Sequence, residues 1–250
     1  MINVGLQLYT VRDECEKDFI GTIRKVTDIG YKGLEFAGYY GMDARELRKI
    51  IDDMGAKAVN SHVSILKMEN DLDAEIEYAN ILGMKTITIP ALPKEIRNDV
   101  KALLKASKEI SAFDERCSSN GIQLCYHNHD FEFARAENEY ILDIYMKEAK
   151  NLKLELDTFW SSYAGLDSVE YMKKYAGRLQ YIHLKDMIKD TKPVFAEVGE
   201  GCLDIGLFIK TAVELGVEWA FVEQDICMRA SLDSVRISME NLKKMDVLKI

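Results

Sequence analysis

The chain has 250 residues, of which 48% are hydrophobic and 30% are charged, and its formal net charge is −9. This length suits either two small domains or one α/β barrel, and the hydrophobic content is enough to fill a sizeable core. An acidic surface repels nucleic acid phosphates, so the composition argues against a nucleic-acid enzyme.

Short apolar stretches recur along the chain and are rich in β-branched and aromatic residues, as buried parallel strands are. In chain order, we expect strands at residues 3–9, 33–37, 56–61, 85–90, 122–127, 152–157, 179–185 and 219–225.

Longer amphipathic stretches separate these strands, with apolar residues at three- and four-residue spacing. The first two end in glycine, as many helices do, and the second opens with Asp43, a good N-cap residue. In chain order, the expected helices cover residues 18–30, 43–55, 72–84, 95–121, 137–149, 166–177, 204–216 and 232–245.

Strict alternation of eight strands with eight helices predicts βαβ crossovers and a parallel sheet. Eight such units in 250 residues favour a closed (β/α)8 TIM barrel, formed as a single domain by residues 1–250. An open doubly wound sheet is the alternative, but it usually carries a glycine-rich phosphate loop after its first strand. The segment GLQLYTVRDECEK contains neither GxGxxG nor GxxxxGK, so a nucleotide-binding interpretation is weak.

The cysteines and the N-terminus bear on the compartment. Five cysteines are scattered without a CxxC pair, which fits reduced thiols in a cytosolic protein. The first residues lack a basic region followed by a long apolar core, and no apolar run approaches about 18 residues. We therefore expect a cytoplasmic protein with no signal peptide and no membrane span.

In a TIM barrel the chemistry lies at the C-terminal ends of the strands. His127, Asp157, His183 and Glu223 stand at the ends of the last four predicted strands, about one βα unit apart, so they can converge at the barrel mouth. Two imidazoles and two carboxylates suit a Mn, Fe, Co or Zn ion that keeps one or two positions open, as a catalytic metal needs.

These residues also have structural alternatives. Asp157 can cap the following helix, and His183 can be a core histidine. Glu223 lies in the otherwise apolar stretch WAFVEQD, where a buried carboxylate needs a partner or a metal. Glu155 has the same face parity as Asp157, one pleat deeper, and we expect it to be a buried carboxylate that does not ligate the metal.

Eight segments together resemble the xylose-isomerase-like barrels, in particular the sugar-phosphate isomerase/epimerase group with ketose 3-epimerases and inosose-handling enzymes. The resemblance covers essentially the whole chain. Each segment is weak alone, but their order and spacing are specific. The segments are GLQLYTVRD, GLEFAGYYG, VNSHVS, LCYHNHDFEF, LELDTFW, YIHLKD, EVGEGCLDI and WAFVEQD.

The resemblance implies one divalent metal ion held by a glutamate, an aspartate, a histidine and a second glutamate. The last three match Asp157, His183 and Glu223. Where relatives carry the first glutamate, this chain has His127. Manganese is the ion that the family most often binds, with Mg, Co, Fe and Zn as alternatives.

The family's reaction places a substrate carbonyl and a neighbouring hydroxyl on the metal, which stabilises an enediolate. Glu223 can act as one proton-transfer base, and either His127 or His129 can act as its partner, with Glu132 as a further option. The resemblance therefore implies an isomerase or epimerase of a keto-sugar or related polyol ketone.

Histidine in place of glutamate makes the ligand set one charge less negative and the metal a stronger Lewis acid. A lyase or dehydratase that performs β-elimination on a keto-inositol or a 3-keto-glycoside is therefore the alternative. A non-catalytic sugar-binding barrel is the second alternative. A metal-dependent nuclease is disfavoured, because the apurinic-site endonucleases of this fold use many histidines and this chain has four.

Five further residues are candidates for substrate binding. His62 can bind sugar hydroxyls or be a structural histidine, and Lys185 can bind a substrate oxygen or pair with a nearby carboxylate. Glu35 can touch substrate or cap a helix, and Trp160 can form an apolar wall beside the sugar or belong to ordinary packing. Glu132 lies in the loop beyond the fifth strand.

We expect a small-molecule sugar as partner, with no nucleic acid and no membrane; a homo-oligomer is compatible with the family.

Overall fold

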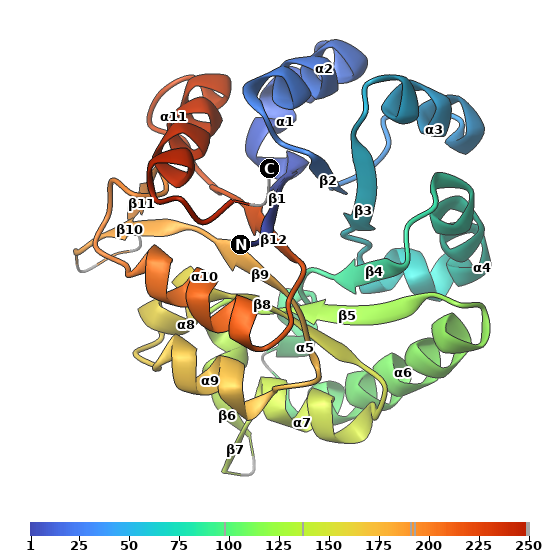
Figure 1. The fold of residues 1–250 in the computed structure, drawn as a ribbon. Helices are drawn as coiled ribbons and strands as arrows, with labels where there is room; N and C mark the ends of the chain where they lie inside the picture. The colour runs from blue at the N-terminus through green and yellow to red at the C-terminus, as the bar shows by residue number, and fades with distance from the viewer. Residues whose placement is uncertain (98, 137, 191, 193, 249–250) are drawn as a thin grey trace.

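A computed structural model describes residues 1–97, 99–136, 138–190, 192 and 194–248. Its centre is a sheet of eight parallel strands, and helices lie around the outside (Figure 1). The strands are β1 (Asn3–Gln7), β2 (Gly33–Phe36), β3 (Lys57–Ser61), β4 (Thr86–Ile89), β5 (Gln123–His127), β8 (Lys153–Asp157), β9 (Leu179–Leu184) and β12 (Trp219–Val222).

The sheet curls into a barrel because its last strand returns to its first. β1 pairs with both β2 and β12, so the strand order is β3-β2-β1-β12-β9-β8-β5-β4. β3 and β4 meet through an isolated bridge between His62 and Thr88, and the Val63 N–H donates to the Thr88 carbonyl at 2.8 Å. The predicted (β/α)8 barrel is confirmed, and the open doubly wound alternative is wrong.

The helices follow the predicted alternation. None of those in the described part of the chain is long and apolar enough to cross a membrane. They are α1 (Arg12–Cys15), α2 (Phe19–Ile29), α3 (Ala44–Asp53), α4 (Ile65–Leu82), α5 (Lys94–Arg97), α6 (Val100–Ser119), α7 (Ile141–Glu148), α8 (Thr158–Tyr163), α9 (Ser168–Lys174), α10 (Ile205–Glu214) and α11 (Ser231–Lys244), with 3-10 turns η1 (Leu8–Val11) and η2 (Phe131–Phe133).

Two predicted helices have different limits in the structure. The helix expected at 72–84 begins earlier as α4, where Ser64 caps the first turn, and its backbone breaks at Asp71 (φ −158°, ψ 76°). The helix expected at 95–121 is divided into α5 and α6; Asp99 caps α6, and residue 98 lies outside the described residues. Capping residues decide where both helices begin, and the spacing of apolar residues does not reveal them.

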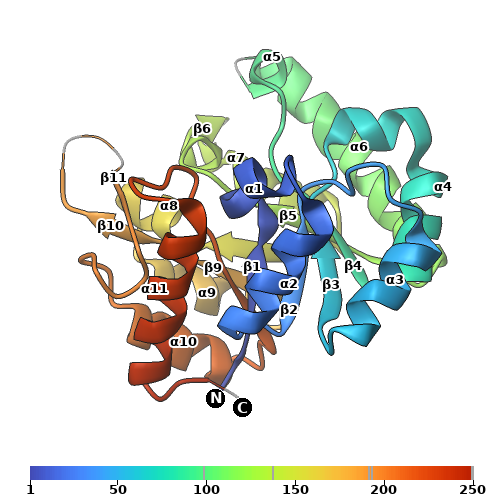
Figure 2. The same cartoon turned by 90° about the horizontal axis from the view of Figure 1, so that it is seen from above.

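Two small hairpins lie outside the eight-stranded sheet. β6 (Arg135–Ala136) pairs with β7 (Glu139–Tyr140), which shortens the helix expected at 137–149, and residue 137 lies outside the described residues. β10 (Asp186–Ile188) pairs with β11 (Val194–Ala196). Figure 2 shows β6, β10, β11 and α5 on the side of the barrel away from the N-terminus, which is the side where the strands end.

The interior of the barrel changes from aromatic to polar along the strands. Tyr181 and Phe221, each two residues before a polar residue of the site, pack with Val59 and Trp219. Gly33 leaves room for this layer, since a Cβ there would overlap the indole of Trp219. The lower interior is therefore filled by these side chains.

Polar side chains come next along the strands, toward their C-terminal ends. Gln7, Glu35 and Asn60 stand in register on β1, β2 and β3, and all three are fully buried. A buried carboxylate is tolerated only with hydrogen-bond partners or compensating charge, so this layer requires polar neighbours from the other strands.

The carboxylate of Asp186 organises the segment that follows β9. It accepts hydrogen bonds from the backbone N–H groups of Met187, Gly199, Gly201 and Leu203, at 2.8 to 3.1 Å. A Cβ on Gly201 would overlap Asp186 Oδ1. The loop thus depends on a buried carboxylate and on a residue without a side chain beside it.

Gly201→Ala should therefore lower the free energy of unfolding by about 1–3 kcal/mol, because the new methyl group must push the carboxylate off its donors. Urea denaturation measures the change. Gly206→Ala is the matched control, since a Cβ there meets only Asp204 Oδ1 at 3.7 Å, and it should be neutral or slightly stabilising. Equal stability of the two variants would contradict this account of the loop.

Candidate active site

A cavity of about 650 Å³ opens at the C-terminal ends of the strands. This volume suits a small organic ligand. Its lining residues are Tyr9, Ala37, Gly38, His62, Val63, Ser64, Lys67, Pro90, Ala91, His127, His129, Trp160, Glu223 and Asp225.

The structure brings His127, Asp157, His183 and Glu223 together beside this cavity. One ligand atom from each lies within 4.8 Å of the others, and all four side chains are buried. His183 Nδ1 lies 2.8 Å from Glu223 Oε2, and His127 Nε2 lies 3.7 Å from Asp157 Oδ2. We call these four residues the outer set.

Asp157 serves two neighbours with its two oxygens. Oδ1 accepts from the N–H groups of Phe159 and Trp160 and so caps α8. Oδ2 is buried and faces His127 Nε2 at 3.7 Å and the Lys185 ammonium at 3.0 Å. The cap fixes the carboxylate and leaves the other oxygen directed at the outer set, so an aspartate that caps a helix here is also placed to ligate a metal. Two nitrogen and two oxygen donors fit a divalent transition metal.

Lys185 supplies positive charge to the outer set. Its ammonium lies 2.8 Å from Glu223 Oε2, 3.0 Å from Asp157 Oδ2 and 3.1 Å from Asp225 Oδ1. Burial alone would lower the pKa of Lys185, but the three carboxylates outweigh it and raise that pKa well above its usual value. In turn, Lys185 and His183 hold the pKa of Glu223 well below its usual range against the effect of burial.

A second carboxylate layer lies beneath the outer set. Glu35 accepts from Gln7 Nε2 at 2.8 Å and from Asn60 Nδ2 at 2.7 Å, and Asn60 also donates to Glu155 at 3.0 Å. His62 Nε2 lies 2.7 Å from Glu155 Oε2. Burial raises the pKa of Glu35 to about 7, and the charge of Glu155 adds to this.

His183 connects the two layers through its two ring nitrogens. Nδ1 faces Glu223, and Nε2 lies 2.7 Å from Glu35 Oε2. Burial would lower the pKa of this imidazole, but Glu35 and Glu155 raise it well above its usual value. A carboxylate behind a histidine fixes the ring and strengthens it as a ligand.

His129 occupies a different environment. Its ring lines the cavity and stacks on Phe131 with centroids 5.2 Å apart, and Trp160 lies 5.6 Å away. Burial lowers the pKa of His129 to about 3, and the nearby Lys185 adds to the effect. Its Nδ1 is buried without a hydrogen bond. The imidazole is therefore neutral and unpartnered at neutral pH.

Of the five residues expected to bind substrate, some line the cavity and the others are buried away from it. His62 and Trp160 line the cavity, and Lys185 lies behind Asp225 with 1% exposure. Glu35 is fully buried beneath the outer set and does not line the cavity. Its surroundings place it to orient His183 instead.

Glu132 is also buried and does not line the cavity. It accepts from the His129 N–H at 2.7 Å and from the Tyr126 hydroxyl at 2.8 Å. This carboxylate holds the segment that carries His129, so its contacts are with the protein.

Sequence reasoning missed Asp225 and Tyr9 as cavity residues. Asp225 stands two residues after Glu223, so strand parity on WAFVEQD could have placed both carboxylates on one face. Tyr9 follows β1 in a 3-10 turn, where strand parity carries no information.

A model of the xylose isomerase-like TIM barrel family matches residues 23–245. Among curated proteins, an inosose dehydratase of Geobacillus kaustophilus is 22% identical over 242 residues, which cover 81% of this chain and 79% of that protein.

Two solved structures share the fold. A sugar phosphate isomerase/epimerase from Parabacteroides distasonis superposes with a TM-score of 0.84 at 24% identity, covering 98% of this chain and 99% of its own. The probable 3-DHS dehydratase of Bacillus anthracis superposes with a TM-score of 0.74 at 14% identity, covering 97% and 99%.

Lys185→Met tests the charge balance of the site. Removing the ammonium leaves buried carboxylates unpaired, so the metal-free variant should lose about 3–5 kcal/mol of unfolding free energy. Saturating Mn²⁺ should recover most of that loss, because the ion supplies the missing charge. Urea denaturation with and without Mn²⁺ measures both effects.

Lys174→Met is the matched control. Lys174 pairs with Asp143, but the side chain is 48% exposed, so its loss should cost about 0–1 kcal/mol with no effect of Mn²⁺. A Lys185→Met variant as stable as this control would contradict the charge balance.

Proposed function

The chain belongs to the xylose isomerase-like TIM barrel family, and on that premise we propose that it is a divalent-metal-dependent dehydratase of a keto-polyol or keto-sugar. The outer set would hold the ion through Asp157, His183, Glu223 and His127. When bound, the ion supplies Lewis-acid polarisation of a substrate carbonyl.

One observation carries the choice of reaction: His129 is a neutral, unpartnered imidazole on the cavity wall. Such a group can remove the proton from the carbon beside the carbonyl. The same nitrogen can then pass that proton to the hydroxyl leaving the next carbon. The C–H and C–O bonds break, a C=C bond forms, and water departs, so one acid–base group completes the elimination.

An epimerase needs a second proton-transfer group on the opposite face of the substrate. Glu223 is held by Lys185 and His183, which stabilise its charged form and make it a weak base. His127 would be a ligand of the ion in the outer set, so its lone pair would not be free to take a proton from the substrate. The inosose dehydratase among the relatives agrees with elimination.

Epimerisation is the second candidate, because Glu223 lines the same cavity as His129. Isomerisation of a keto-sugar would use the same pair. Dehydration and these alternatives all begin with proton abstraction beside a carbonyl. They differ in whether the neighbouring hydroxyl leaves.

The cavity wall favours an uncharged substrate. Lys67 is the one lysine or arginine among the described lining residues, and it pairs with Glu75 at 2.6 Å. Glu223 and Asp225 add negative charge to the wall, which opposes a phosphate ester. A free keto-polyol such as a keto-inositol fits this environment better than a sugar phosphate.

Incubation of the Mn²⁺-loaded protein with keto-inositols and keto-hexoses in deuterated water tests the proposal. NMR should show loss of water and a dehydrated product. Epimeric or isomeric product that carries carbon-bound deuterium, with no dehydrated product, would contradict dehydration and support the second candidate.

His129→Ala is the variant for the same assay. It should slow dehydration by about 10²-fold or more, because general acid–base catalysis contributes at least that much, while Mn²⁺ affinity stays unchanged. Tyr9→Phe, which alters the same cavity but keeps the imidazole, should stay close to wild-type rates. Equal loss in both variants would argue against His129 as the base.

A further inference from the structure

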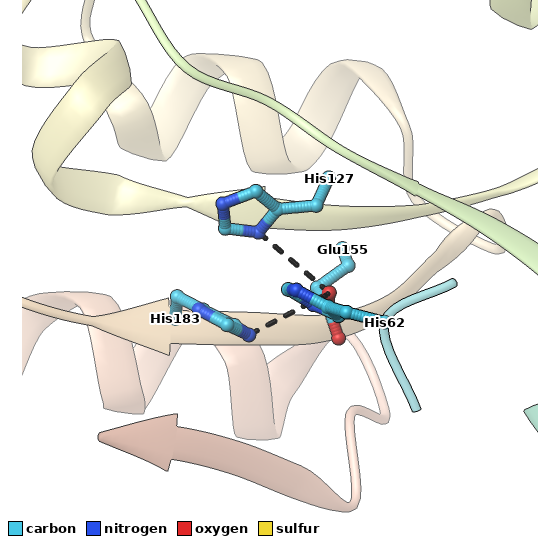
Figure 3. Close-up of side chains that lie close together, drawn as sticks. All are labelled: His62, His127, Glu155 and His183. Carbon is cyan, nitrogen blue, oxygen red and sulfur yellow. Dashed lines mark hydrogen bonds and ion pairs between the residues drawn. The ribbon is translucent and has the colours of Figure 1, made fainter. Parts of the chain in front are cut away.

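Four side chains converge inside the barrel, beneath the outer set. His62, His127, Glu155 and His183 each offer a ligand atom within 4.8 Å of the others. Figure 3 shows the three imidazoles arranged around the Glu155 carboxylate. We call these four residues the inner set; it shares His127 and His183 with the outer set.

Two ring nitrogens point into the inner set, and one of them, His127 Nδ1, has no hydrogen bond. His127 Nδ1 is buried and lies 3.6 Å from Glu155 Oε2. His183 Nε2 is also buried; it lies 3.5 Å from the same oxygen and 2.7 Å from Glu35 Oε2. A buried polar atom without a partner is costly, and an ion among these four side chains would give His127 Nδ1 a partner.

The charges of the inner set also suit a dication. Glu155 is fully buried, and the fully buried Glu35 lies beside it, with Oε2 3.4 Å from His62 Nε2. Two carboxylates and one divalent ion sum to zero, so neutral imidazoles could then complete the shell. Burial of charge without such compensation is unfavourable.

We infer that the inner set is a second metal site, which takes a nitrogen-preferring divalent ion such as Zn²⁺ and excludes the ion of the outer set. Three imidazoles and one carboxylate match the ligand preference of zinc, whereas the outer set has two imidazoles and two carboxylates and suits manganese better.

The exclusion follows from the shared rings. A neutral imidazole has one lone pair for a metal, on one nitrogen. The two sets use opposite nitrogens of His127 and of His183, so an ion in one set withdraws both rings from the other. Zinc in the inner set would thus act as an inhibitor of the Mn²⁺ form; this consequence rests on the proposed function, whereas zinc binding itself does not.

Metal-binding measurements on three variants test the inference. Zn²⁺ affinity is measured by competition with a chromophoric chelator, and Mn²⁺ affinity by the electron paramagnetic resonance signal of the free ion. His62→Ala should weaken Zn²⁺ binding about tenfold or more and leave Mn²⁺ binding unchanged. Asp157→Ala should do the reverse. His129→Ala removes a histidine of the same cavity that belongs to neither set, and it should change neither affinity.

Zinc added to the Mn²⁺-loaded wild type should release about one Mn²⁺ per zinc bound. Zinc that binds without releasing Mn²⁺ would overturn the exclusion. Zinc affinity that falls in Asp157→Ala but not in His62→Ala would place zinc in the outer set and overturn the inner site. Zinc binding that His62→Ala weakens, in a protein that binds no Mn²⁺, would support the inner site and contradict the proposed function.

X-ray absorption of the zinc-loaded wild type keeps the test independent of folding in the variants. Three imidazole ligands support the inner set, and two or fewer contradict it. Glu155→Gln is the second variant, and it should weaken zinc binding as His62→Ala does.

Discussion

Buried negative charge at the barrel mouth is the constraint on which the rest of the site depends. Glu35, Glu155, Asp157 and Glu223 are each 5% exposed or less; they lie on β2, on β8 and directly after β12. Carboxylates in such a place need compensating charge. Lys185 provides it among Asp157, Glu223 and Asp225, and the imidazoles of His62 and His183 provide it around Glu35 and Glu155. A divalent ion would supply the same positive charge as Lys185 and these imidazoles. The carboxylates that need compensation for stability are therefore also the ones that would attract the ion.

The barrel could be predicted from sequence because each strand is short, apolar and separated from the next by one amphipathic helix. Strand ends also predicted which four residues would meet in the outer set. How deep each side chain lies in the barrel was harder to predict, because it depends on the register between neighbouring strands. Glu35 and Glu132 were expected at the substrate, but register and local turns bury them against Gln7, Asn60 and Tyr126. Asp157 illustrates a further limit, since its two oxygens serve a helix cap and the outer set at once.

Histidine at position 127 shapes the proposed chemistry. A glutamate there would offer a charged base, whereas the buried imidazole is neutral and has a second nitrogen directed at Glu155. In the proposed reaction His129 is then the base, which favours elimination by one acid–base group over exchange between two. The same substitution gives the inner set its third imidazole. The proposed reaction type and the proposed metal choice thus both depend on one residue.

The central claim is that the outer set binds a divalent ion. Its most direct test is the metal content of the purified protein after supplementation with Mn²⁺ and removal of free ion. The account predicts about one Mn²⁺ per chain, bound with release of protons as the ligands deprotonate. Less than about a tenth of an equivalent would contradict it, because four buried donor atoms within 4.8 Å of one another should retain the ion.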